Sequence, residues 1–180
     1  MSRLQDRKLK ITRISDSFAS YAKLQCAGSN PKELRILTLS SSSTIRAALI
    51  NLITTTPDLQ IDLRILESRP LFEGVGLASA ITQEVKSATK GLDRSTVRII
   101  VYTDASSAIA SRDIDFLLLG ADRISADGSV SNKTGSLPAI LSARHASPRC
   151  KIVVLSELEK VAIAEEHGVE ENDQIGRAHV

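Results

Sequence analysis

Aromatic residues are scarce in this sequence: they make up 3% of its 180 residues, and tryptophan is absent. This scarcity argues against a platform of stacked aromatic rings for single-stranded nucleic acid. The core must therefore consist mainly of Leu, Ile, Val and Ala, a mixture that suits helices packed on a parallel sheet.

Cysteine and excess charge are scarce as well. Cys26 and Cys150 lie far apart, and no His, Cys or carboxylate cluster has the spacing of metal ligands, so we predict no metal and no cofactor. A net charge of +2 indicates neither nucleic acid nor a membrane as partner. No apolar run could span a bilayer, and the charged start at residues 1–7 is no secretory signal, so we expect a cytoplasmic protein.

The length and the 42% content of hydrophobic residues indicate one domain with a short arm. We assign residues 1–30 to a basic arm and a helix, and we expect the arm to be a frayed, solvated end. Residues 31–174 form the main domain. Residues 175–180 lack periodicity and match a translated sequencing adaptor, so we expect an artefactual tail on a truncated chain.

Short apolar runs alternate with helical patterns through the main domain. The runs predict strands near residues 36–39, 61–66, 97–102, 116–119 and 152–155, with helices between them and a last helix over 158–167. Such βαβ units with short connections predict an α/β fold: a parallel sheet with helices on both faces.

The most informative motif follows the fourth predicted strand. Residues 120–124 read Gly-Ala-Asp-Arg-Ile, which places Asp122 at the carboxyl end of that strand, where ligands bind in open α/β sheets. Asn132 and Lys133 follow ten residues later on a second loop. An acid, an amide and a phosphate-binding cation could then line one pocket. On spacing alone, Asp122 as a turn cap and Lys133 as a solvated loop residue fit equally well.

Polar groups also follow the other predicted strands. The serine-rich corner at residues 40–44 precedes a helix, so Ser40, Ser43 and backbone N–H groups could hold a phosphate, although a plain N-cap fits too. Arg69, Glu73 and Asp104 follow the next two strands and should reach the same edge of the sheet. The glycines at 74 and 76 come too late after their strand for a dinucleotide fingerprint.

Over residues 35–155 the order of these motifs resembles one superfamily. It contains methylthioribose-1-phosphate isomerase, ribose-1,5-bisphosphate isomerase and the alpha, beta and delta subunits of translation initiation factor 2B. The matching pieces are Ile-Leu-Thr at 36–38, Glu-Ser-Arg-Pro at 67–70 with Gly74, Thr-Asp at 103–104, and residues 120–135. The resemblance implies a Rossmann-like domain, as in ribose-5-phosphate isomerase and CoA transferases.

The isomerase branch implies a function. Its members convert an aldose 1-phosphate to a ketose 1-phosphate, with Asp122 transferring protons and Asn132 and Lys133 binding substrate. Ser40 stands at the position of the family's cysteine. The implied partner is a phosphorylated pentose or a similar small phosphate ligand, and the full-length protein should form homo- or hetero-oligomers.

Two residues differ from those of the isomerases, so the choice between the branches of the superfamily stays open. Serine is a much weaker acid than cysteine and cannot replace it without a base beside it. Glu73 replaces the family's glutamine and should repel phosphate, so both an active and an inactive isomerase remain open. The alternatives are a regulatory or interaction protein like the translation-factor subunits, or a sugar-phosphate or nucleotide-phosphate sensor without turnover.

Overall fold

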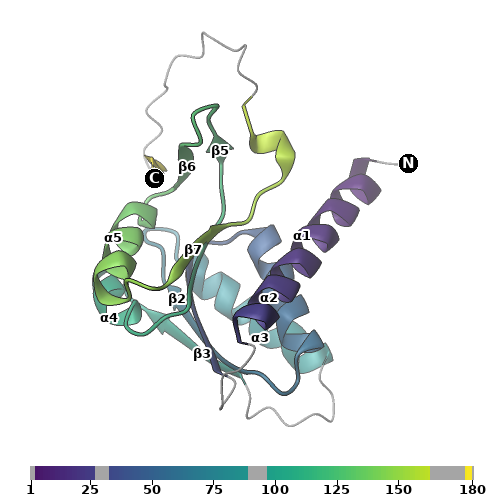
Figure 1. Cartoon of the computed structure of the whole chain (residues 1–180), viewed down its shortest axis with the longest axis horizontal. Helices are drawn as coiled ribbons and strands as arrows, with labels where there is room; N and C mark the ends of the chain where they lie inside the picture. The colour runs from purple at the N-terminus through teal and green to yellow at the C-terminus, as the bar shows by residue number, and fades with distance from the viewer. Residues whose placement is uncertain (1–2, 27–32, 89–96, 163–176, 180) are drawn as a thin grey trace.

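The centre of the protein is a parallel sheet of five strands. The computed structural model describes residues 3–26, 33–88, 97–162 and 177–179. The strands are β1 (Glu33–Leu39), β2 (Gln60–Leu66), β3 (Val97–Tyr102), β4 (Phe116–Leu119) and β7 (Lys151–Val154). They pair in parallel in the order β3-β2-β1-β4-β7, which confirms the predicted α/β architecture (Figure 1).

Helices cover both faces of this sheet. Alternate residues of its strands point to opposite sides, so apolar side chains lie on both faces and must be buried. Ile36 and Leu118 belong to one hydrophobic cluster, and their neighbours Leu37 and Leu117 belong to another. On the first side lie α1 (Arg3–Gln25), α2 (Ser43–Thr55) and α3 (Glu73–Ala88). On the second side lie α4 (Ser107–Ala110) and α5 (Ser136–Ala146), and Figure 1 shows the two groups on opposite flanks.

The basic N-terminal segment is part of a helix, so the expectation of a frayed arm was wrong. Helix α1 runs without a break from Arg3, since neither Gly nor Pro interrupts the sequence before residue 28. It packs along α2, and Phe18 and Tyr21 place their rings edge-on against Phe116 of β4 at centroid distances of 5.8 and 5.7 Å. These contacts hold the helix, and with it the basic segment, on the domain.

A second, smaller sheet was not predicted. Strands β5 (Arg123–Ile124), β6 (Val130–Lys133) and β8 (Arg177–His179) pair antiparallel. The turn between β5 and β6 contains Gly128 with φ +88°, and Asp127 accepts hydrogen bonds from the N–H and hydroxyl of Ser129, which lower the pKa of its carboxyl. Strand β8 lies in the tail that we expected to be artefactual.

The last predicted helix is also different. Residues Leu158–Lys160 form only a 3-10 turn, η2, and Val161 then bridges Ile124 in parallel. The remainder of the predicted helix, residues 163–167, lies outside the described residues. In Figure 1 the η2 turn lies between the β5–β6 hairpin and the N-terminal half of α1.

Ser42 caps α2, and its removal should weaken the domain slightly. Its side chain accepts a hydrogen bond from the N–H of Ile45 at 3.3 Å. We expect Ser42→Ala to lower the free energy of unfolding by about 1 kcal/mol. Urea denaturation checks this, with Ser79→Ala in the interior of α3 as control. Equal losses for the two variants would contradict the capping role.

Candidate functional site

A polar pocket of about 150 Å³ opens at the carboxyl ends of β1 and β4, and we call it the strand-end pocket. Its lining residues are Arg7, Leu39, Ser40, Ser41, Ser42, Ser43, Thr44, Gly120, Ala121, Asp122, Asn132, Lys133, Glu157 and Lys160. Five of the predicted site residues are among them: Ser40, Ser43, Asp122, Asn132 and Lys133. The serine corner and the Gly-Ala-Asp motif therefore meet in space, as their strands do.

The β5–β6 hairpin brings the acid, the amide and the cation together. The N–H of Asp122 donates to the carbonyl of Ser131 at 2.8 Å, so the chain after β4 lies directly beside β6. Asn132 is buried, at 7% exposure, and its amide nitrogen donates to Ser136 Oγ at 2.9 Å. Ser136 in turn donates to the carbonyl of Lys133. These bonds fix the amide and the backbone that carries the ammonium.

Ser40 occupies an unusual backbone conformation at the end of β1. Its φ is +63°, a region that residues other than glycine seldom adopt. Its N–H donates to Ser68 Oγ at 2.6 Å, and its own hydroxyl donates to Glu73 Oε2 at 2.9 Å. The side chain is therefore buried, at 6% exposure, and held from two sides.

Glu73 does not line the pocket, but its carboxylate contacts two residues that do. Its Oε1 lies 3.4 Å from Lys133 Nζ, while Oε2 accepts the Ser40 hydroxyl. The repulsion of phosphate expected from the sequence is thus reduced by the ammonium. The same contact gives Ser40 a carboxylate beside it, which the sequence alone did not indicate.

Arg69 and Asp104 do not line the pocket. The two oxygens of Asp104 accept hydrogen bonds from the N–H groups of Ser68 and Arg69, at 2.9 and 2.8 Å. The Arg69 guanidinium pairs with Glu67 at 3.1 Å and lies over the ring of Phe72. Both predicted residues therefore organise the loop that supports Ser40.

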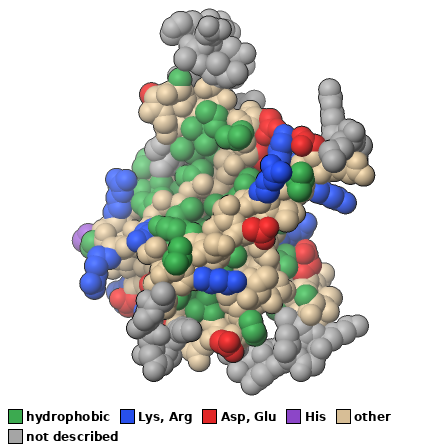
Figure 2. All heavy atoms as spheres, turned by 45° about the vertical axis from the view of Figure 1, so that its right-hand side comes forward, with side chains coloured by type: hydrophobic (Ala, Val, Ile, Leu, Met, Phe, Trp, Pro, Cys, Tyr) green, Lys and Arg blue, Asp and Glu red, His purple; other side chains and the backbone are tan. Residues whose placement is uncertain are grey.

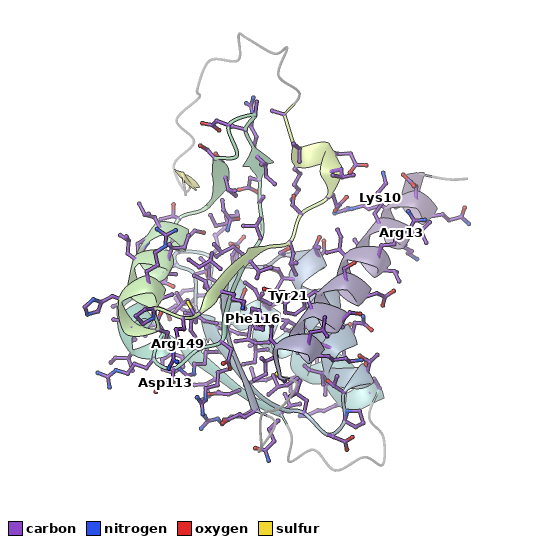
Figure 3. The ribbon with its side chains drawn as sticks, in the orientation of Figure 1. Lys10, Arg13, Tyr21, Asp113, Phe116 and Arg149 are labelled. Atoms are coloured by element: carbon purple, nitrogen blue, oxygen red, sulfur yellow. The ribbon has the colours of Figure 1, made fainter. Side chains whose placement is uncertain are left out.

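Two cations of the pocket were not predicted from the sequence. Arg7 of α1 reaches it and pairs with Glu157 at 3.4 Å, and the Lys160 ammonium donates to the carbonyl of Ala121. Nearby on α1, Lys10, which is labelled in Figure 3, bonds Glu159 and lowers the pKa of that carboxyl. Because the partners of these ion pairs are about 150 residues apart, no local pattern in the sequence indicates them.

A larger hollow of about 430 Å³ lies at the opposite edge of the sheet. Its walls include Asp113, Phe116 and Arg149. In Figure 3 Asp113 and Arg149 lie below α5, away from the hairpin, and Phe116 lies near the middle of the domain. None of the predicted site residues lines it, so volume alone does not identify the site.

The fold and the strand-end pocket together define a Rossmann-like α/β domain with a small polar pocket at the carboxyl edge of its sheet. Within the described ranges no group of three or more His, Cys, Asp or Glu residues could hold a metal ion. No helix in that part of the chain is long and apolar enough to cross a membrane.

Comparison with known families agrees with the resemblance. The model of the initiation factor 2 subunit family (IF-2B) matches residues 12–175, so the chain belongs to this family. It is 33% identical over 81 residues to methylthioribose-1-phosphate isomerase of Leptospira interrogans, covering 44% of this chain and 20% of that protein. It is 29% identical over 117 residues to the isomerase of Desulforudis audaxviator, covering 63% and 31%.

Solved structures show the same fold. The translation initiation factor eIF-2B of Pyrococcus horikoshii OT3 superimposes with a TM-score of 0.64 at 24% identity, covering 86% of this chain and 49% of that one. A chain of the tetrameric eIF2B-beta2-delta2 complex of Chaetomium thermophilum gives 0.64 at 14% identity, covering 92% and 50%. The chain thus spans about half of these structures and less than a third of the two isomerases.

Proposed function

We propose that this chain is the sugar-phosphate-binding domain of an isomerase that converts an aldose 1-phosphate to a ketose 1-phosphate. The observation that carries the proposal is the grouping of Asp122, Asn132 and Lys133 beside the first turn of α2 in one pocket. A helix begins with unpaired N–H groups and a partial positive charge, and the first turn of α2 carries no acidic residue. Phosphate is the anion that such a site favours.

Each group then has a role. Lys133 and the N-terminal turn of α2 bind the phosphate, and Asn132 hydrogen-bonds a sugar hydroxyl. Asp122 transfers a proton during ring opening, a reaction that needs an acid–base group in a site shielded from water. The isomerisation exchanges hydrogen within one molecule, so it needs no external redox cofactor. The substrate class is a phosphorylated pentose, such as methylthioribose 1-phosphate or ribose 1,5-bisphosphate.

A second function, an interaction subunit like those of translation initiation factor 2B, is favoured by two observations. Ser40 and Glu73 depart from the residues of the isomerases, and large apolar side chains are exposed, including Leu158 at 85% and Leu141 at 58%. Figure 2 shows hydrophobic side chains reaching the surface between scattered basic and acidic ones. Under either function we propose that the full-length protein assembles into homo- or hetero-oligomers.

Replacement of Lys133 tests the binding site. We expect Lys133→Met to weaken the affinity for both sugar phosphates about tenfold, because a charge-assisted hydrogen bond to phosphate is lost. Calorimetric titration measures this, with an NMR assay for ketose product alongside. Lys86→Met, which removes an exposed lysine from α3, is the matched control. Absence of binding of either sugar by the unmodified chain would favour the interaction subunit.

A further inference from the structure

The contacts of Glu73 suggest a role beyond that of a supporting residue. Its carboxylate bridges two groups of the proposed site: the Ser40 hydroxyl at 2.9 Å and the Lys133 ammonium at 3.4 Å. Resting on the function proposed above, we infer that Glu73 restrains Lys133 until a phosphate takes its place, and then accepts the proton that passes through Ser40. Glu73 is thus a positioning residue and proton acceptor that acts through Ser40.

The first support is that the Ser40–Glu73 contact is held by the surrounding structure. Ser40 has φ +63° and Ser68, which accepts its N–H, has φ +60°. Ser68 is itself fixed by Asp104 and by a bond from its hydroxyl to the carbonyl of Leu66. Unfavourable backbone conformations persist only where the surroundings impose them, and they gather at functional sites.

The second support is the position of Glu73 at the first residue of α3, packed tightly against the sheet. The next residue, Gly74, donates its N–H to the carbonyl of Glu67, which anchors the start of the helix. Glu73 is the acidic residue of the first turn of α3, a position that the helix dipole favours for a carboxylate. Lys133 is half-exposed and can turn from this carboxylate toward a ligand.

Two proton transfers and one hydrogen shift convert the sugar. Ser40 Oγ takes the proton of the sugar 2-hydroxyl while its own proton passes to Glu73 Oε2. The electron pair left on O2 forms the C2 carbonyl as the C2 hydrogen moves with its bonding pair to C1. The C1–O4 bond breaks toward O4, which takes a proton from the carboxyl group of Asp122. The sugar loses one proton and gains one, and solvent returns Glu73 and Asp122 to their starting states.

Proton transfer from Ser40 to Glu73 explains why both residues differ from those of the isomerases. A serine hydroxyl is nearly all neutral at pH 7, so it accepts a proton only if it can release its own to a base. A glutamine at position 73 could accept a hydrogen bond but not a proton. Serine beside glutamate can therefore pass on its proton, whereas serine beside glutamine cannot.

Glu73→Gln should separate binding from turnover. We expect it to tighten the binding of inorganic phosphate and of the sugar phosphates about fivefold, because Lys133 is released and a negative charge is removed. We expect turnover to fall about tenfold or more, because Ser40 loses its proton acceptor. Binding is followed by titration calorimetry and turnover by NMR.

Three further variants complete the test. Ser40→Ala should lower turnover at least as much as Glu73→Gln and change the affinity less than twofold, since only a neutral hydroxyl is lost. The double variant should be no slower than Ser40→Ala, because Glu73 acts through Ser40. Glu84→Gln, which removes an exposed, ion-paired carboxylate from the same helix, should match the unmodified chain.

Several outcomes would overturn the inference. Weaker or unchanged phosphate affinity in Glu73→Gln would contradict the restraint of Lys133. Additive losses in the double variant, or undiminished turnover in Glu73→Gln, would contradict proton transfer to Glu73. Sugar phosphates that bind without turnover in the unmodified chain would refute the proton transfer and the isomerase activity together. Inorganic phosphate bound more tightly by Glu73→Gln, with neither sugar bound by any variant, would refute the proposed function and leave the restraint of Lys133 supported.

Discussion

Gly74→Ala should destabilise the domain severely. A β-carbon at this position would lie 1.9 Å from the carbonyl oxygen and 2.9 Å from the carbonyl carbon of Leu66, and 3.1 Å from Ile65 Cγ2. Because β2 is paired with β1 on one side and with β3 on the other, its backbone cannot move aside without breaking the sheet. We expect the free energy of unfolding to fall by about 3 kcal/mol or more.

Gly76→Ala is the matched control. It lies on the same helix, and nothing is within 4 Å of the β-carbon that it would add. Alanine is the better helix former by about 1 kcal/mol, so this variant should be as stable as the unmodified chain or slightly more stable. Urea denaturation followed by circular dichroism measures both. Equal stability of the two variants would show that α3 can shift away from β2.

The sheet could be predicted because its signal is local. The run at Phe116–Leu119 is fully apolar, and all four side chains are buried in the structure. A central strand covered on both faces must look like this wherever it occurs. The parallel order follows from the short helical connections between such strands. The fold class therefore needed no information about contacts distant in the sequence.

The small sheet and the last turn could not be predicted in the same way. Strand β5 has two residues, too few for any periodicity, and β6 is polar, with Ser131, Asn132 and Lys133 in sequence. Its pairing depends on the turn at Gly128. The length of α1 was underestimated because its charged residues were taken to indicate a solvated arm, whereas the helix packs along α2 and places Phe18 against Phe116.

The site residues also differ in whether their contacts could be predicted from the sequence. Asp122, Asn132 and Lys133 are close in the sequence and follow a strand, so their meeting could be predicted from topology. The contacts of Glu73 with Ser40 and Lys133 join three different elements, and only the structure supplies them. Asp104 shows the converse error: a polar residue at a strand end supports a loop and does not line the pocket.

Asp122→Asn should abolish isomerisation while sparing the fold. The side chain is half-buried in the strand-end pocket, and its own N–H, which the substitution keeps, holds the hairpin through Ser131. Asparagine has nearly the same shape but cannot donate a proton to the departing ring oxygen. We expect turnover to fall by about 100-fold or more, the usual contribution of a positioned acid–base group.

Measuring the affinity for phosphate distinguishes a loss of proton transfer by Asp122 from damage to the pocket. The substitution leaves Lys133 and the N-terminus of α2 in place, so phosphate should bind at least as tightly in Asp122→Asn. Asp127→Asn, at the tip of the same hairpin and outside the pocket, is the control, since asparagine also supports such turns. An Asp122→Asn variant that still forms ketose at the unmodified rate would remove Asp122 from the mechanism. A variant that binds no phosphate would instead place Asp122 among the residues that build the pocket.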